Sequence, residues 1–216
     1  MRLIFLGSAG VGKGTYAQLV AKEYKLPIIS SGQLLREELK QSTPDALKAK
    51  AYMDKGVLVP NKLLNQFILT RLSKKDCKNG FVFDGFPRSL EQAKWLDKVT
   101  SIDLVFSFVA PKSIIFKRLS GRMFCAKCNI VYNNETKEPR KNGVCDSCGG
   151  KIAQRDDDTP VAIKKRIEIY QTEVKKVIEY YRKGKILYEI DASYNLDEVH
   201  KIIDPVMNII DDFDTD

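Results

Sequence analysis

The chain has 216 residues, of which 44% are hydrophobic and 30% charged, and its formal net charge at pH 7 is +8. This length and composition predict one sizeable domain with a real core and room for small insertions. No apolar run approaches the roughly 20 residues of a membrane span, and Met1–Ala9 is too short for a secretory signal, so we expect a cytoplasmic protein without a membrane partner. The positive charge suits anionic partners, either nucleotides or nucleic acid.

A glycine-rich segment near the start of the chain carries the most specific chemistry. It follows an apolar run at Arg2–Leu6 and opens a helical pattern at Thr15–Glu23, which is the context of a phosphate-binding loop. The amides of such a loop surround phosphate oxygens, the helix N-terminus adds its positive dipole, and Lys13 adds a point charge. A plain glycine-rich turn is the alternative. The predicted phosphate-binding residues are Gly10, Val11, Gly12, Lys13, Gly14 and Thr15, and the ending Gly-Lys-Gly-Thr is typical of nucleoside monophosphate kinases.

Strand-like runs alternate with helical patterns along most of the chain, which predicts an α/β fold with a parallel sheet covered by helices. The strand-like runs are Arg2–Leu6, Pro27–Ile29, Phe81–Phe83, Leu104–Val109 and Ile186–Ile190. The helical patterns are Thr15–Glu23, Ser31–Lys40, Asp45–Lys55, Pro60–Leu72, Ser89–Lys98, Pro111–Gly121 and Thr159–Lys183. We expect the last pattern to form one long helix, capped by Thr159 and ended by Gly184.

Residues 123–158 interrupt the alternation and contain four of the five cysteines. The cysteines form two Cys-x-x-Cys pairs separated by sixteen residues, a spacing that indicates a four-thiolate zinc site. So short an insertion cannot bury much apolar surface, so a structural metal is expected to replace a core. Two disulfides are the alternative, which a cytoplasmic location disfavours. The predicted ligands of the structural zinc are Cys125, Cys128, Cys145 and Cys148.

Further motifs occur in a fixed order along the chain. After the glycine-rich loop come Ser30–Arg36, Gly56–Pro60, Asp84–Arg88 with Gln92, Gly121-Arg122, the cysteine pairs, Arg155–Asp158 and Arg166. With these motifs the chain closely resembles an adenylate kinase of the long-lid, zinc-containing type, from Met1 to about Ile210. The resemblance implies a phosphate-loop kinase core with a five-stranded parallel sheet flanked by helices, at residues 1–29, 60–121 and 160–216. It also implies an AMP-binding helical insertion at residues 30–59 and a zinc-ribbon lid at residues 122–159.

The resemblance further implies the reversible transfer of a phosphoryl group from MgATP to AMP, giving two ADP, by a monomer without a nucleic-acid partner. The ATP-binding residues would be the glycine-rich loop together with Arg118, Arg122, Val131 and Tyr132. The AMP-binding residues would be Ser31, Arg36, Val57, Leu58, Val59, Gly85, Phe86, Pro87, Arg88, Gln92, Arg155 and Arg166. The residues acting on the transferring group would be Lys13, Arg88, Arg122, Arg155 and Arg166.

The residue types fit this chemistry without the resemblance. Phosphoryl transfer needs alignment and charge neutralisation more than covalent chemistry, and the planar guanidinium groups of arginine match phosphate oxygens. Asp84 ends an apolar strand-like run, where a carboxylate can hold Mg²⁺ through water; a helix or turn cap is the alternative. For Arg118 the alternative is a surface ion pair.

Gln33 stands where relatives usually carry an aspartate that orders magnesium-bound water.

Two other functions stay open. The first is a kinase of another nucleoside monophosphate, or an AMP kinase with GTP as the donor. The second is a zinc-ribbon nucleic-acid-binding protein with a nucleotide switch, which the positive charge permits. The ribbon lacks the stacking aromatic residues of proteins that bind single strands, and its charges are of mixed sign.

Overall fold

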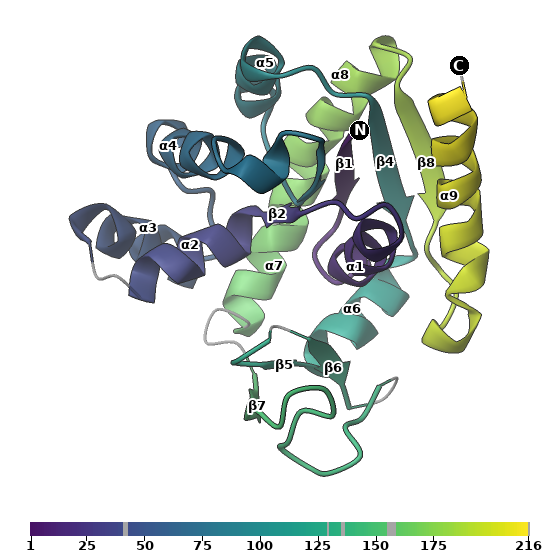
Figure 1. The fold of residues 1–216 in the computed structure, drawn as a ribbon. Coiled ribbons are helices and arrows are strands. Elements are labelled where there is room, and N and C mark those ends of the chain that lie inside the picture. Colours follow the sequence, from purple (N-terminus) through teal and green to yellow (C-terminus); the bar gives the residue numbers. More distant parts are fainter. Residues whose placement is uncertain (41–42, 129, 135–136, 155–158, 216) are drawn as a thin grey trace.

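The computed structural model describes residues 1–40, 43–128, 130–134, 137–154 and 159–215. A five-stranded parallel sheet lies at its centre, with the strand order β2-β3-β1-β4-β8 (Figure 1). This confirms the predicted α/β fold and all five strand-like runs. The strands are β1 (Arg2–Gly7), β2 (Ile28–Ser30), β3 (Phe81–Asp84), β4 (Leu104–Val109) and β8 (Leu187–Asp191).

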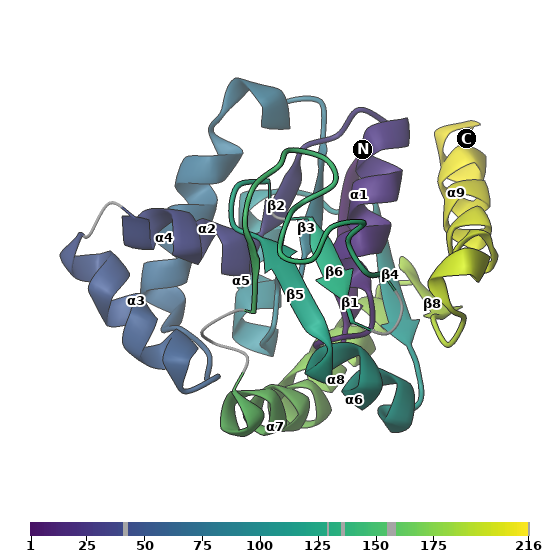
Figure 2. The same ribbon diagram turned by 90° about the horizontal axis from the view of Figure 1, so that it is seen from below.

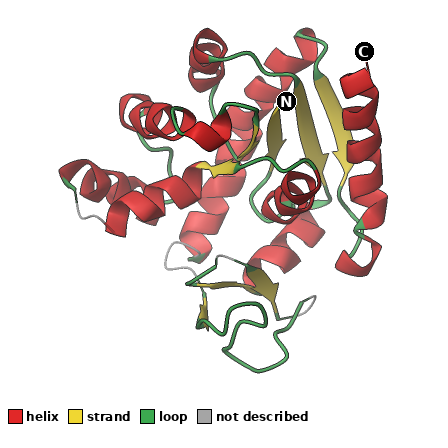
Figure 3. Ribbon diagram, viewed as in Figure 1, coloured by secondary structure: helices red, strands yellow, loops and turns green. Residues whose placement is uncertain are grey.

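The apolar runs become strands because both faces of the sheet are covered by helices (Figure 3). On one face Leu3, Phe5 and Phe106 pack against helices α1 and α9. On the other face Ile4, Phe83 and Val105 pack against helices that include α5 and α8. These four helices are α1 (Lys13–Glu23), α5 (Leu90–Val99), α8 (Lys175–Lys183) and α9 (His200–Thr215).

Two groups of elements project from this core. Helices α2 (Ser31–Lys40) and α3 (Pro44–Asp54) follow β2, and α4 (Asn61–Leu72) returns the chain toward β3 (Figure 1). The second group follows helix α6 (Lys112–Ser120) and is a small antiparallel sheet with the order β6-β5-β7. Its strands are β5 (Arg122–Cys125), β6 (Val131–Asn133) and β7 (Ile152–Ala153), and Figures 1 and 2 place it beyond the carboxyl ends of the parallel strands.

The long helix predicted after this small sheet is not continuous. Helix α7 (Pro160–Ile169) is followed by a π-helical turn at Tyr170–Val174, and α8 completes the run. The Thr172 hydroxyl donates to the Glu168 carbonyl at 3.0 Å, a side-chain bond that competes with regular helix bonds. The ends agree with the prediction, because Thr159 caps α7 and Gly184 follows α8. In the described ranges, no helix has the length and apolar character needed to cross a membrane.

Candidate functional site

A cleft of about 280 Å³ lies at the carboxyl ends of the parallel strands, where open α/β sheets bind their ligands. Its walls come from the glycine-rich loop, the end of β3, α2, α6, the small antiparallel sheet and α7. The structure thus brings together most residues predicted from motifs that lie far apart in the sequence. The predicted residues in the lining are Gly10, Gly12, Lys13, Gly14, Thr15, Ser31, Arg36, Val57, Leu58, Val59, Asp84, Gly85, Pro87, Arg88, Gln92, Arg118, Arg122, Val131, Tyr132 and Arg166.

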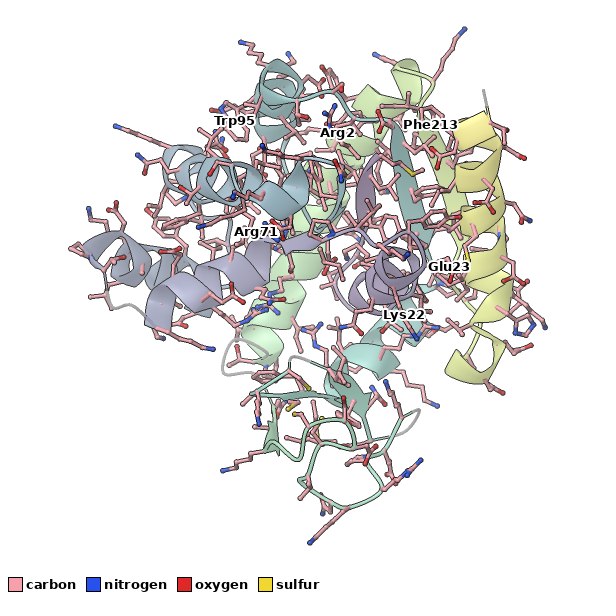
Figure 4. All side chains as sticks on the ribbon, in the orientation of Figure 1. Arg2, Lys22, Glu23, Arg71, Trp95 and Phe213 are labelled. Carbon is pink, nitrogen blue, oxygen red and sulfur yellow. The ribbon has the colours of Figure 1, made fainter. Side chains whose placement is uncertain are left out.

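Two predicted binding residues do not line the cleft. Val11 and Phe86 are both 0% exposed, and each belongs to the hydrophobic core. The Phe86 ring packs against Phe83 and Trp95, with centroid distances of 5.2 and 6.2 Å, and Figure 4 shows Trp95 at helix α5. Their side chains are therefore structural, and only their backbones can serve the site. Arg155, a further predicted residue, lies outside the described residues.

The glycine-rich loop has a backbone that requires glycine. Gly10 and Gly12 have φ angles of 81° and 115°. A Cβ on Gly10 would lie 2.5 Å from Leu119 Cγ, and one on Gly12 would lie 2.5 Å from the Tyr16 ring. Helix α1 begins at Lys13 without a side-chain cap, and its first turn, Lys13 to Thr15, lines the cleft. The first N–H groups of a helix are those that can bind a ligand in place of an intrahelical partner. This is the arrangement that binds phosphate at a helix N-terminus.

Lys13 is folded back over this loop. Its Nζ donates to the carbonyls of Gly7 and Ser8, both at 2.8 Å. Burial lowers the pKa of Lys13 to about 8, although the Asp84 carboxylate opposes this effect, and the charges of Arg88 and Arg122 add to it. Several cations therefore share one small space, and an anionic ligand would relieve their repulsion.

Asp84 ends β3 and lies beside the first turn of α1. It is opposite Phe5 in the pairing of β1 with β3, and a Cβ on Gly14 would lie 3.5 Å from Asp84 Oδ2. The next helix, α5, is capped by Ser89, which accepts from the Gln92 amide at 3.3 Å, so the capping alternative for Asp84 is wrong for this helix. A carboxylate next to a phosphate loop fits a hydrated Mg²⁺, which prefers oxygen ligands.

The segment after Asp84 is held by hydrogen bonds to its neighbours. Arg88 Nε donates to the Gly85 carbonyl at 2.7 Å, and Ser31 Oγ donates to the same carbonyl at 2.9 Å. Gln92 is 1% exposed; its Oε1 accepts from the Arg88 amide at 2.7 Å and its Nε2 donates to Asn61 Oδ1 at 2.8 Å. The Gln92 carboxamide thus orients Arg88, a contact that its motif alone did not indicate.

Arg118 connects two loops at the other end of the cleft. Its guanidinium donates to the carbonyls of Val11 at 2.8 Å, Ala192 at 2.9 Å and Tyr194 at 2.5 Å. The Tyr16 hydroxyl also donates to the Val11 carbonyl, at 3.1 Å. The alternative of a surface ion pair is therefore wrong for Arg118, because its partners are backbone carbonyls.

The four cysteines of the insertion come together as predicted. Their Sγ atoms all lie within 4.8 Å of one another, and Cys125 and Cys145 are buried. The Sγ distances of 3.4 Å for Cys125–Cys148 and 3.5 Å for Cys128–Cys145 exceed the roughly 2.05 Å of a disulfide. The Tyr132 hydroxyl donates to Cys145 Sγ at 3.3 Å, a bond that suits a thiolate. This donor set fits a tetrahedral structural zinc.

Some lining residues were not predicted. Asn61, Asn133 and Lys137 were not among the predicted site residues. Asn133 and Lys137 line the cleft, and Asn61 supports it through Gln92. Lys137 Nζ lies 5.6 Å from the centroid of the Tyr132 ring. Asn133 could have been found, because it directly follows the predicted pair Val131 and Tyr132. Gln33 is absent from the lining, and its carboxamide donates to Glu37 Oε1 at 2.8 Å.

The fold and the cleft define a class of protein. A phosphate-binding loop on β1, an aspartate on the neighbouring β3 and several arginines around the same cleft are the parts of a phosphoryl-transferring P-loop protein. The family model described as adenylate kinase matches residues 5–186, and the chain belongs to the adenylate kinase family. It is therefore a nucleotide-binding transferase of the kinase class, which confirms the family resemblance.

Similar proteins cover nearly the whole chain. The adenylate kinase of Caldicellulosiruptor bescii is 44% identical over 204 residues, which are 92% of this chain and 94% of that protein. The adenylate kinase of Clostridium tetani is 40% identical over 215 residues, 97% of this chain and 100% of that protein. The adenylate kinase of Archaeoglobus fulgidus is also 40% identical over 215 residues, 97% of this chain and 99% of that protein.

Proposed function

We propose that this protein transfers the terminal phosphoryl group of ATP reversibly to AMP and so forms two ADP. One observation carries the proposal: a single cleft collects the phosphate loop with Lys13, the Asp84 carboxylate and arginines from four separate elements. These arginines are Arg36 on α2, Arg88 after β3, Arg122 on β5 and Arg166 on α7. Their placement suits two phosphate chains that meet end to end.

The two nucleotides take opposite ends of the cleft in this proposal. ATP lies on the phosphate loop, with its phosphates on Lys13 and Arg122 and its nucleoside near Arg118, Val131 and Tyr132. AMP lies between α2 and the segment after β3. Its side-chain and backbone contacts are Ser31, Arg36, Val57, Leu58, Val59, Gly85, Pro87, Arg88 and Gln92. Val11 and Phe86 contribute through their backbones alone.

Charge stabilisation is the proposed source of catalysis. The transferring phosphoryl group passes between Arg88, Arg122 and Arg166, whose positive charges face the negative charge that develops on its oxygens. Arg155 is proposed for the same role. The acceptor phosphate is already an anion, so no side chain has to remove a proton from it. Asp84 would hold the Mg²⁺ that accompanies ATP, and this ion supplies further charge neutralisation to the phosphates.

The proposal assigns a different role to each of three parts of the chain. Residues 122–159 form a lid that closes over ATP and excludes water, because water in the site would hydrolyse ATP. Cys125, Cys128, Cys145 and Cys148 would hold a zinc that cross-links this lid and takes no part in transfer. Residues 30–59 form the AMP-binding part, and the remainder is the core. The proposed enzyme works as a monomer in the cytoplasm.

A coupled assay of ADP formation tests the proposed function. The full chain is given each of ATP and GTP as donors with each of AMP, GMP, CMP and UMP as acceptors, with and without Mg²⁺. We expect turnover with ATP and AMP that needs Mg²⁺. Preferred turnover of another acceptor or of GTP would replace the substrate assignment. Hydrolysis of ATP without an acceptor, or salt-dependent binding of single-stranded nucleic acid, would argue against a transferase.

A further inference from the structure

Asn133 is a buried residue whose side-chain carboxamide lies where the lid joins the core. It ends strand β6, is 7% exposed, and is paired with Arg122, the first residue of β5. The amide of the next residue, Asn134, donates to the Gly121 carbonyl at 3.0 Å. The lid thus returns to the point where it leaves helix α6, and Asn133 lies at this junction of lid and core.

The Asn133 carboxamide holds the end of helix α6. Its Nδ2 donates to the Arg118 carbonyl at 3.0 Å, one of the last four carbonyls of the helix, which have no intrahelical partner. The carboxamide also covers Gly121: a Cβ there would lie 3.0 Å from Asn133 Oδ1 and 3.1 Å from Nδ2. The contact is therefore both bonded and tightly packed, so a small change on either side disturbs it.

Arg118 extends this contact to the phosphate loop. The backbone carbonyl of Arg118 accepts from the Asn133 carboxamide, and the Arg118 guanidinium donates to the Val11 carbonyl. It also donates to the carbonyls of Ala192 and Tyr194 in the loop after β8. A hydrogen-bonded path therefore runs from the lid strand β6, through the end of α6, to the loop that would hold the ATP phosphates.

We propose that Asn133 is a positioning residue that fixes the angle of the lid on the core and so sets the affinity for the donor nucleotide. This inference rests on the proposed function, in which ATP binds beneath the lid. When the contact is lost, fewer molecules hold the lid in the arrangement that receives ATP, and the apparent affinity falls by the same factor. AMP binds on the side of α2, which this path does not reach, so the affinity for AMP stays unchanged.

Two variants disturb the contact from opposite sides. Asn133→Asp keeps the shape of the side chain and replaces the donating NH₂ by a carboxylate oxygen, which repels the Arg118 carbonyl. Gly121→Ala presses a methyl group against the same carboxamide from the core side. Gly121 has a φ of −91°, which alanine adopts without strain, so the variant tests the contact alone. Asn134→Ala is the matched control, because the exposed Asn134 bonds Gly121 through its backbone.

The readouts separate the two nucleotides. ATP binding is measured by calorimetry on the full zinc-containing chain, and kcat and both KM values come from the ADP assay. We expect Asn133→Asp and Gly121→Ala each to weaken ATP binding about fivefold, the effect of one net hydrogen bond. The KM for AMP, kcat and the control variant are expected to stay within about twofold of the parent. Asn133→Ala is also measured, alone and combined with Gly121→Ala. In this double variant the clash is absent, so the losses of the two alanine variants are less than additive.

The zinc content and the melting of each variant identify a merely structural role. If Asn133 only stabilises the fold, its variants should lose zinc or melt the lid at a lower temperature. They should also weaken the binding of ATP and of AMP together. Equal losses for ATP and AMP, an unchanged ATP affinity in both variants, or a failure of both to fold overturns the proposal. If the parent chain binds ATP but does not phosphorylate AMP, the proposed function fails instead, and the calorimetric comparison still decides the role of Asn133.

Discussion

Arg88 reaches the cleft already oriented by its own segment. Its Nε is bonded to the Gly85 carbonyl and its amide to Gln92 Oε1, and Gln92 is in turn bonded to Asn61. A charge held in this way loses little free energy to reorganisation when it meets the transferring group. Several partly buried hydrogen bonds therefore fix the direction of one guanidinium.

Arg88→Ala is expected to lower kcat by roughly 10²–10³-fold and to change both KM values much less, because it removes a charge that acts mainly in the transition state. Arg88→Lys keeps the charge without the planar fork and should recover only part of the rate. Steady-state kinetics with ATP and AMP measure both effects. Arg182→Ala, at an exposed ion pair with Glu189, is the control. A rise in the KM for AMP alone would make Arg88 a ground-state anchor.

The pH dependence of ATP binding should report on Lys13. Burial lowers its pKa from the usual 10.5 to about 8, and the phosphates of ATP favour the charged form. Below about pH 8 the free protein already carries this charge; above it, binding must take up a proton, and the affinity should fall by up to about tenfold per pH unit. Calorimetry in two buffers of different ionisation enthalpy measures the affinity and the proton uptake. A constant affinity up to about pH 9.5 would contradict this assignment.

The strands and the glycine-rich loop could be predicted because their signals are local. Other features depend on distant partners. The carbonyls that hold Arg118 belong to residues 107, 74 and 76 positions away, so its position between two loops has no local pattern. Val11 and Phe86 lie within binding motifs, yet their apolar side chains point into the core. The π-helical turn at Tyr170–Val174 keeps the apolar spacing of a regular helix and was therefore predicted as one.

The start of helix α7, next to the lid, should depend on its cap. Thr159 Oγ1 accepts from the Ala162 amide at 3.2 Å, and Pro160 occupies the first turn. Thr159→Ala should lower the free energy of unfolding by about 1 kcal/mol, and Thr159→Ser should change it by only a few tenths. Thr43 caps α3 with the same geometry, 3.2 Å to the Ala46 amide, so Thr43→Ala is a matched comparison. Denaturant titration measures all three, and an unchanged midpoint in Thr159→Ala would contradict the assigned cap.

The core and the lid are stabilised in different ways. Two large clusters of buried side chains, one on each face of the parallel sheet, hold the core together. Among the described residues, the cluster of the lid buries only Cys125, Tyr132, Cys145 and Ile152. So little apolar surface cannot offset the conformational entropy of the segment, so the lid needs a cross-link that the core does not need.

Removing zinc is therefore expected to unfold the lid before the sheet. Cys128→Ser or strong chelation should lower the first calorimetric transition and leave the later one unchanged, and freshly purified protein should contain one zinc per chain. Cys77→Ser, at a thiol buried in the core outside the lid, should preserve zinc and the first transition. Transfer activity should fall with the lid, because an ordered lid excludes water. Two disulfides without metal, or unchanged melting after chelation, would show that the cysteines stabilise the lid in another way.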